Sequence, residues 1–213
     1  MCSPRKEEPL HIYMVYDEPV NGYNVTGVFY PFNETSETGQ VELYFNPVDG
    51  GKPLVLSNVG QYEKGQPEYP MKFAGKNILD YCLREEFDGY HSGDTLHCHY
   101  YDTNEYYRDS PLFYDAEFQF FDVDFDGKQE LLINGYDKSR TGNHYFVYEM
   151  TTECFVLREE EPFTEIDNTT RFIPELCQIV TYNPDGAFST VMNTYSLFEE
   201  GEVINIDVQT FVE

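Results

Sequence analysis

The sequence contains no tryptophan, few basic residues and no long apolar segment. Its 213 residues include 13 Lys and Arg against 39 Asp and Glu, a formal net charge of −26. This charge excludes binding to a phosphate backbone, which requires a basic surface. No run of 18 apolar residues and no secretory h-region is present, so no membrane-spanning helix is predicted. The charge favours divalent cations and basic proteins as partners, or else serves solubility alone.

Signatures of common enzyme classes are also missing. We find no GxSxG, HExxH, P-loop or dinucleotide-binding fingerprint, and we expect a protein that is not an enzyme. The cysteine spacing contains no CxxC, which argues against a zinc ribbon and a thioredoxin-like site. Apart from Cys2, the sequence leaves open whether the cysteines form disulfides in one of three pairings or stay as packed thiols. These are Cys82, Cys98, Cys154 and Cys177.

Aromatic residues are abundant, with 19 Tyr and 17 Phe, and both types favour strands. Short apolar or alternating runs recur at a spacing of about 8–12 residues, which predicts an all-β sandwich, barrel or propeller. The predicted strands lie within residues 11–16, 25–30, 40–45, 53–58, 94–101, 116–121, 130–135, 144–150, 154–159, 177–182, 187–198 and 203–212.

One segment departs from this strand pattern. Residues 76–87 have the apolar spacing of a short helix, carried by Ile78, Leu79, Cys82 and Leu83. Residues 1–9 are polar with two prolines and predict a flexible tail, and residues 10–213 predict a single domain. The Asp-Gly at 185–186 and the Glu-Gly at 200–201 are typical of hairpin connections.

The most informative stretch is FFDVDFDGKQELLI at residues 120–133, where an acidic loop separates two predicted strands. Aspartates at alternate positions can curl around one cation, and Gly127 allows the sharp turn that follows. An all-oxygen set selects a hard cation, and we predict Ca²⁺. The predicted ligands are Asp122, Asp124, Asp126, the carbonyl of Lys128, and Glu130. The alternative is a solvated acidic turn.

This loop is not an EF-hand, because position twelve is Ile133 and the flanking segments are predicted strands. The pattern D-x-D-x-D-G-x-x-E between strands resembles the calcium loops of FG-GAP and VCBS propeller repeats. Together with the aromatic segments around it, it resembles bacterial envelope proteins with a single such loop, among them secretion-system immunity proteins that inhibit lysozyme-like hydrolases. The resemblance implies a small β-propeller-like domain of antiparallel strands, with a β-sandwich as the alternative.

The N-terminal segment MCSPRKEEP bears on localisation. A cysteine followed by polar residues resembles the start of a mature bacterial lipoprotein, and the run Lys6-Glu7-Glu8 resembles surface-export signals of Bacteroidetes lipoproteins. The hydrophobic leader of such proteins is missing here. We expect lipidation at Cys2 and a place in the bacterial envelope, in the periplasm or at the outer membrane, with a cytoplasmic protein as the alternative. That lipid would be the sole contact with a membrane.

Two further segments are weaker candidates. His97 and His99 would share a face of a strand and could bind zinc, but no third ligand is marked. The Tyr-rich residues 100–114 suit either a recognition surface or ordinary packing. We therefore expect a calcium-stabilised protein that binds another protein, such as a basic lysozyme-like hydrolase. A glycan-binding module is the alternative, and the absence of tryptophan weighs against it.

Overall fold

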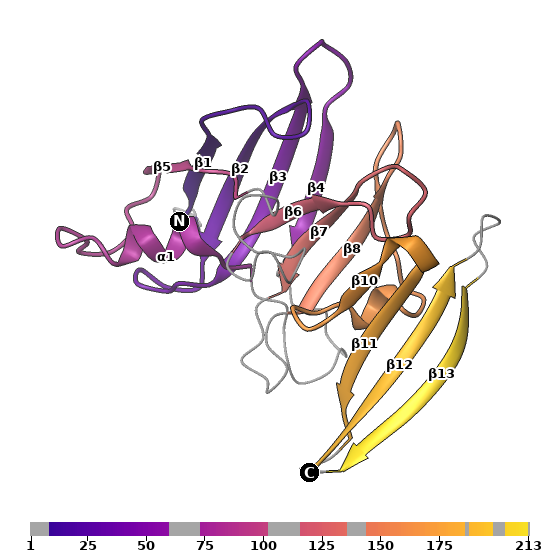
Figure 1. Ribbon diagram of the computed structural model, residues 1–213. Coiled ribbons are helices and arrows are strands. Elements are labelled where there is room, and N and C mark those ends of the chain that lie inside the picture. Colours follow the sequence, from indigo (N-terminus) through magenta and orange to yellow (C-terminus); the bar gives the residue numbers. More distant parts are fainter. Residues whose placement is uncertain are drawn as a thin grey trace, which may run out of the picture.

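A computed structural model describes residues 9–59, 73–101, 116–135, 144–185, 188–197 and 203–212. These residues form thirteen β-strands in three sheets, one α-helix and two 3-10 turns. Figure 1 shows the sheets following one another across the molecule in chain order. Within the described residues, no helix combines the length and hydropathy needed to cross a membrane.

The first sheet has five strands in the order β4-β3-β2-β1-β5. Its strands are β1 (Ile12–Tyr16), β2 (Tyr23–Pro31), β3 (Gly39–Pro47), β4 (Leu54–Val59) and β5 (Thr95–Cys98). All neighbours are antiparallel except β1 and β5, which are parallel. Buried residues alternate with more exposed ones along β2 and β3, as expected for strands with one face against a core.

The second sheet is an antiparallel meander in the order β6-β7-β8-β9. Its strands are β6 (Phe118–Phe121), β7 (Glu130–Gly135), β8 (His144–Met150) and β9 (Phe155–Leu157). Every residue of β7 is buried. The helix α1 (Lys76–Cys82) lies before β5 in the chain, and Asn77 and Ile78 are its buried residues.

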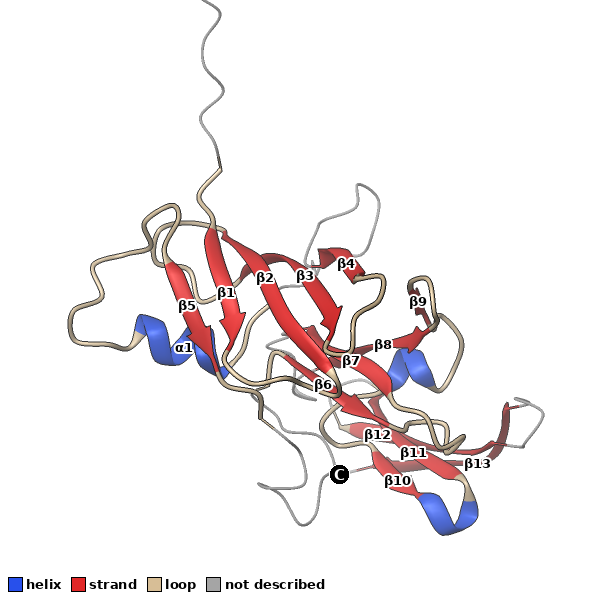
Figure 2. Cartoon of the chain, turned by 90° about the horizontal axis from the view of Figure 1, so that it is seen from above, coloured by secondary structure: helices blue, strands red, loops and turns tan. Residues whose placement is uncertain are grey.

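The third sheet has the order β10-β11-β12-β13, and all its neighbours are antiparallel. Its strands are β10 (Arg171–Ile173), β11 (Gln178–Pro184), β12 (Ser189–Leu197) and β13 (Val203–Val212). The 3-10 turn η1 (Phe163–Glu165) precedes β10, and η2 (Pro174–Leu176) separates β10 from β11. Figure 2 shows this sheet on the side of the second sheet that is away from β1 and β5.

Two hydrophobic clusters hold the layers together, and β7 belongs to both. Leu131 and Ile133 of β7 pack with residues of the first sheet in the larger cluster. Leu132 points into the smaller cluster, which includes Phe163 of η1 and Ile179 of β11. Because side chains alternate between the faces of a strand, the apolar run of β7 is explained by burial on both faces.

The predicted all-β class with one short helix is confirmed. The described sheets are stacked in sandwich-like layers, which was the alternative to a propeller-like arrangement. The segments predicted at residues 130–135, 144–150 and 203–212 coincide with β7, β8 and β13. The turn residues Gly186, Glu200 and Gly201 lie outside the described residues, but the strands on either side pair as expected for hairpins.

Three features were not predicted correctly. The helix ends at Cys82 rather than near residue 87, because Leu83 is exposed and turns follow it. The short β10 was missed, since three residues give too little periodicity. The parallel pairing of β1 with β5 could not be read from local patterns, because it joins segments about eighty residues apart.

Candidate cation site in the β6–β7 loop

Residues 122–129 connect β6 to β7, and the loop begins and ends at the paired residues Phe121 and Glu130. The apolar residues between the aspartates anchor this loop. Val123 is fully buried in the smaller hydrophobic cluster, and Phe125 packs against that cluster. Phe125 also has a positive φ of 64°, which is unusual for a residue with a large side chain. The alternation of acidic and apolar residues thus fixes the loop to the core while leaving its carboxylates together.

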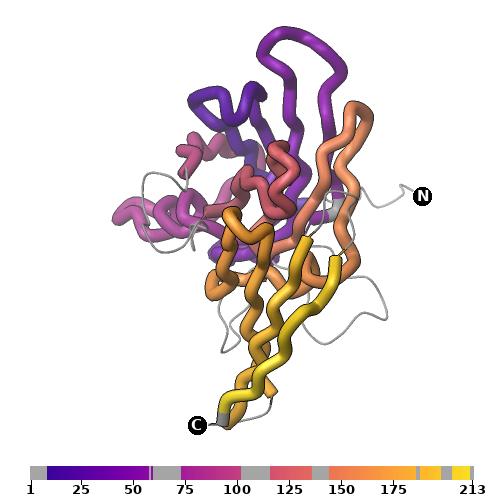
Figure 3. Tube along the Cα trace, turned by 45° about the vertical axis from the view of Figure 1, so that its right-hand side comes forward, coloured from indigo at the N-terminus to yellow at the C-terminus, as the bar shows by residue number. Residues whose placement is uncertain are grey.

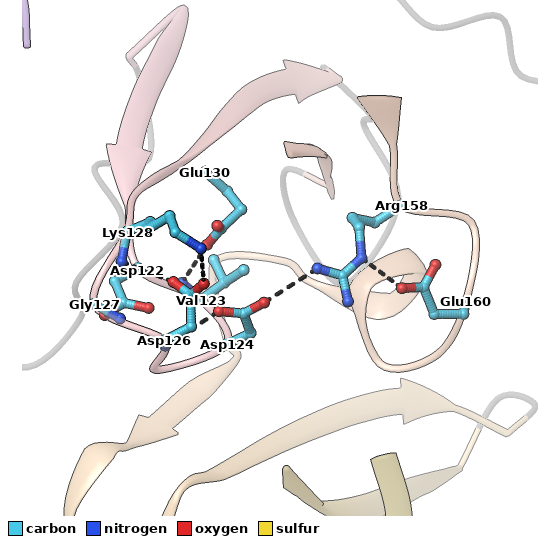
Figure 4. Close-up of polar contacts among 9 residues, drawn as sticks. All are labelled: Asp122, Val123, Asp124, Asp126, Gly127, Lys128, Glu130, Arg158 and Glu160. Carbon is cyan, nitrogen blue, oxygen red and sulfur yellow. Dashed lines mark hydrogen bonds and ion pairs between the residues drawn. The ribbon is translucent and has the colours of Figure 1, made fainter. Parts of the chain in front are cut away.

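Three carboxylates converge in this loop. One oxygen from each of Asp122, Asp124 and Glu130 lies within 4.8 Å of the other two (Figure 4). Two oxygens that share a Ca²⁺ ion at 2.3–2.6 Å can be at most about 5 Å apart. The spacing and the all-oxygen chemistry therefore fit a hard cation such as Ca²⁺.

Asp122 provides a second observation that points to a ligand. The N–H of Gly127 donates to its Oδ2 at 3.0 Å. Its Oδ1 is buried and has no hydrogen-bond partner among the described atoms. A buried charged oxygen without a partner is costly, and a cation would remove that cost. Gly127 has a φ of +83°, so the sharp turn predicted at this position is present.

Glu130 is the most buried of the three carboxylates. The N–H of Val123 donates to its Oε2 at 2.9 Å. Burial raises the pKa of Glu130 to about 7, and the charges of Asp124 and Asp122 raise it further. Such a rise indicates that the carboxylates oppose one another when no cation is between them.

Asp124 also contacts a basic residue from elsewhere in the chain. Nη1 of Arg158 donates to its Oδ2 at 3.2 Å, and both side chains are mostly buried. Arg158 lies just after β9, with its guanidinium 3.9 Å from the ring centroid of Phe163, and it pairs with Glu160. Sequence reasoning missed Arg158, because 34 residues separate it from Asp124 and no motif links the two.

Asp126 does not belong to the group of converging carboxylates. The N–H of Lys128 donates to its Oδ1 at 2.7 Å, and the ammonium of Lys128 contacts its Oδ2 at 2.6 Å. These hydrogen bonds hold the pKa of Asp126 below its usual value. Asp126 and the Lys128 carbonyl stay predicted ligands, and Asp126 would have to leave Lys128 to reach the ion.

The other candidates are not brought together. Nδ1 of His97 contacts Oδ1 of Asp17 at 2.7 Å at the surface. His97 and His99 belong to no group of three potential ligands in the described part of the chain. The four cysteines beyond Cys2 are free thiols: Cys98 is buried, Cys82 half-buried, and Cys154 and Cys177 exposed. Cys2 and residues 102–114 of the Tyr-rich segment lie outside the described residues.

A second buried carboxylate, Glu117, lies at the start of α1. Its Oε1 accepts the backbone N–H of Asn77 at 2.8 Å, and its Oε2 accepts Nδ2 of the same residue at 2.9 Å. Burial raises the pKa of Glu117 to about 7, while these hydrogen bonds lower it. Gly75 makes this approach possible, because a Cβ there would lie 2.5 Å from Cδ of Glu117. Glu117 thus caps a helix that has no capping side chain of its own.

Comparisons with known proteins assign no family. No protein-family model and no curated protein sequence matches the chain. A solved structure, described as that of a Xanthomonas type IV secretion system related protein, superposes with a TM-score of 0.48 at 13% sequence identity. The alignment covers 91% of this chain and 79% of that chain. A likeness at this level does not extend a function to this chain.

Proposed function

We propose that this chain is a calcium-stabilised, non-enzymatic binding protein of the bacterial envelope. The observation that carries the calcium part is the convergence of Asp122, Asp124 and Glu130, together with the buried, unpartnered Oδ1 of Asp122. Carboxylate oxygens at this spacing are the donor set that Ca²⁺ prefers. Bound calcium would supply a positive charge between carboxylates that otherwise repel one another.

The position of the loop makes a stabilising role more suitable than a switch. The loop joins paired strands, and Val123 ties its middle to the smaller hydrophobic cluster. Glu130 is itself the first residue of β7, the strand that packs in both clusters. Little chain is free to move, so ion binding would stabilise the native state by mass action.

The test is a calcium titration followed by calorimetry. Wild-type protein should bind one Ca²⁺, and Asp124→Ala should abolish binding because it removes a central ligand. Asp49→Ala is the matched control, since Asp49 is an exposed aspartate in another strand connection. Asp126→Ala should weaken binding less than Asp124→Ala, because the Asp126 carboxylate is bound to Lys128. An unchanged calcium affinity in Asp124→Ala would rule out the site.

The proposed partner is a basic protein, and a lysozyme-like hydrolase is the candidate that the sequence resemblance suggests. The support is the net charge of −26, which would steer a basic partner towards this surface. Exposed charges are screened over about 8 Å at physiological ionic strength. Added salt should therefore slow association much more than it speeds dissociation.

The partner is tested by binding kinetics against a panel of lysozymes and peptidoglycan amidases at several salt concentrations, with inhibition assays on each enzyme that binds. A glycan array is run in parallel. Binding to glycans and to none of the hydrolases would favour the glycan-binding alternative. Hydrolysis of peptidoglycan by the protein alone would contradict the non-enzymatic assignment.

The envelope assignment is tested separately through Cys2. The natural gene is expressed in a bacterial host with labelled palmitate, and the membrane fraction is examined. We expect label in the wild-type protein and none in Cys2→Ser. A wild-type protein that stays unlabelled and in the cytosol would favour the cytoplasmic alternative.

A further inference from the structure

Strand β13 forms an open edge of the third sheet. It spans ten residues and pairs with β12 on one side. Among the described residues, no strand pairs with its other side. Figure 3 shows β11, β12 and β13 projecting from the rest of the molecule. An edge of this length presents a row of backbone donors and acceptors that can pair with another chain.

The side chains of β13 are apolar and accessible. Val208 is 60% exposed, Ile206 50% and Phe211 49%. The strand VINIDVQTFV has one charged residue, Asp207, whereas 24% of the whole chain is charged. Native edge strands are usually protected by several charges, prolines or bulges.

The protection on β13 is limited to one part of the strand. A register shift between Thr194 and Tyr195 of β12 lies opposite Ile206, and Asp207 follows it. From Asp207 to Val212 the pairing with β12 is uninterrupted. This second half therefore offers a regular edge, and a regular edge is what strand addition requires.

We propose that β13 is the contact between two copies of this chain, paired edge to edge in an antiparallel manner. The charge of the molecule selects this occupant. Two chains of −26 repel one another, and they can approach only through a segment with almost no charge. A basic partner drawn by the net charge would find only Asp207 on this strand, so charge complementarity directs it elsewhere.

A contact between identical strands also satisfies the chemistry of the edge. In a two-fold contact, the same surface meets itself, so apolar residues of one β13 lie beside apolar residues of the other. The unpaired backbone groups of both strands gain partners, and two four-stranded sheets become one continuous sheet. This contact involves no residue of the calcium site and does not depend on calcium.

Sedimentation velocity over a range of protein concentrations tests the proposal, using the wild type and two variants. Val208→Lys places a charge on the edge, and Val55→Lys does the same on the edge strand β4, where Val55 is 44% exposed. The two variants have equal net charge. We expect wild type and Val55→Lys to dimerise alike, and Val208→Lys to weaken the dimer about tenfold or more, which is about 1.4 kcal/mol. Salt should strengthen the wild-type dimer by screening repulsion.

Hydrogen exchange identifies the strand involved. Exchange in the peptide that contains Val203–Val212 should slow as protein concentration rises, while exchange in the peptide of β4 should not. Circular dichroism confirms that both variants are folded. A wild-type protein that stays monomeric at high concentration in both low and high salt overturns the proposal. A dimer in which β13 exchange is independent of concentration, or which both lysine variants weaken equally, overturns it as well.

Discussion

Two buried glutamates in this protein have the same elevated pKa of about 7, yet their surroundings differ. Glu117 faces hydrogen-bond donors, because Asn77 offers both its backbone N–H and its side-chain amide. Glu130 accepts the N–H of Val123 and otherwise faces two further carboxylates, Asp122 and Asp124. Burial is the largest cause of the raised pKa at both positions.

The comparison shows why burial alone does not identify a cation site. The carboxylate of Glu117 receives its compensation from the protein, as donors at the start of α1. The compensation for Glu130 is incomplete, since Asp122 keeps a buried oxygen without a partner in the described residues. A buried charge requires partners, and when the protein does not provide enough of them, an ion can. The following predictions separate the two cases.

The largest effect is expected at Glu117. Glu117→Ala removes the acceptor of two buried donors and leaves a cavity, so the free energy of unfolding should fall by about 4 kcal/mol. Urea unfolding should give the same loss in calcium and in chelator. A loss that depended on calcium would mean that Glu117 and the β6–β7 loop are coupled.

The pH dependence of stability should also report on Glu117. Its folded pKa of about 7 lies above the ordinary value of 4.5, so the folded state holds its proton more tightly than the unfolded state. The resulting stabilisation is complete below pH 4.5 and is lost as pH rises to about 7, amounting to about 3 kcal/mol.

The measurement compares the pH slopes of unfolding for wild type and Glu117→Gln, both in chelator. Other groups, including Glu130, contribute equally to both proteins and cancel. The variant should have a shallower fall between pH 4.5 and 7. Equal slopes would place the pKa of Glu117 near its ordinary value.

Calcium should stabilise the wild-type protein by about 2.7 kcal/mol at a hundredfold excess over its dissociation constant. Glu130→Gln keeps an acceptor for the Val123 N–H but removes a charged ligand, so most of this gain should disappear. In chelator at pH 8 the variant should be at least as stable as wild type, because it removes a buried charge beside two others. Thermal unfolding with and without calcium measures both effects, and a variant that is destabilised only in chelator would contradict the assignment.

The smallest effect is expected at Arg158. Its guanidinium already offers positive charge to Asp124, so it should compete with calcium for that carboxylate. Arg158→Gln should raise calcium affinity about fivefold, a coupling of about 1 kcal/mol. Lys128→Gln is the matched control and should change affinity less, because the Lys128 ammonium is exposed and bound to Asp126. A fall in affinity on changing Arg158 would show that it positions Asp124 instead.

The local features of this protein could be predicted from its sequence. The acidic loop, its glycine turn and the strands on either side lie within residues 118–135, and their spacing indicates backbone conformations formed by neighbouring residues. The alternation along β2 and β3 likewise indicates strands with one buried face. Such patterns are readable because the side chains that form them are close in the sequence.

Contacts between distant segments were decided only by the tertiary structure. Arg158 approaches Asp124 from 34 residues away, and Glu117 caps α1 from 40 residues away. The apolar strands β7 and β13 both read as strands in the sequence, but β7 is buried on both faces and β13 is exposed. The sequence by itself determined where strands and carboxylates occur along the chain. Which strand becomes the centre, which becomes an edge and which carboxylates lack donors depends on how the sheets stack, because burial is set by neighbours that are remote in the sequence.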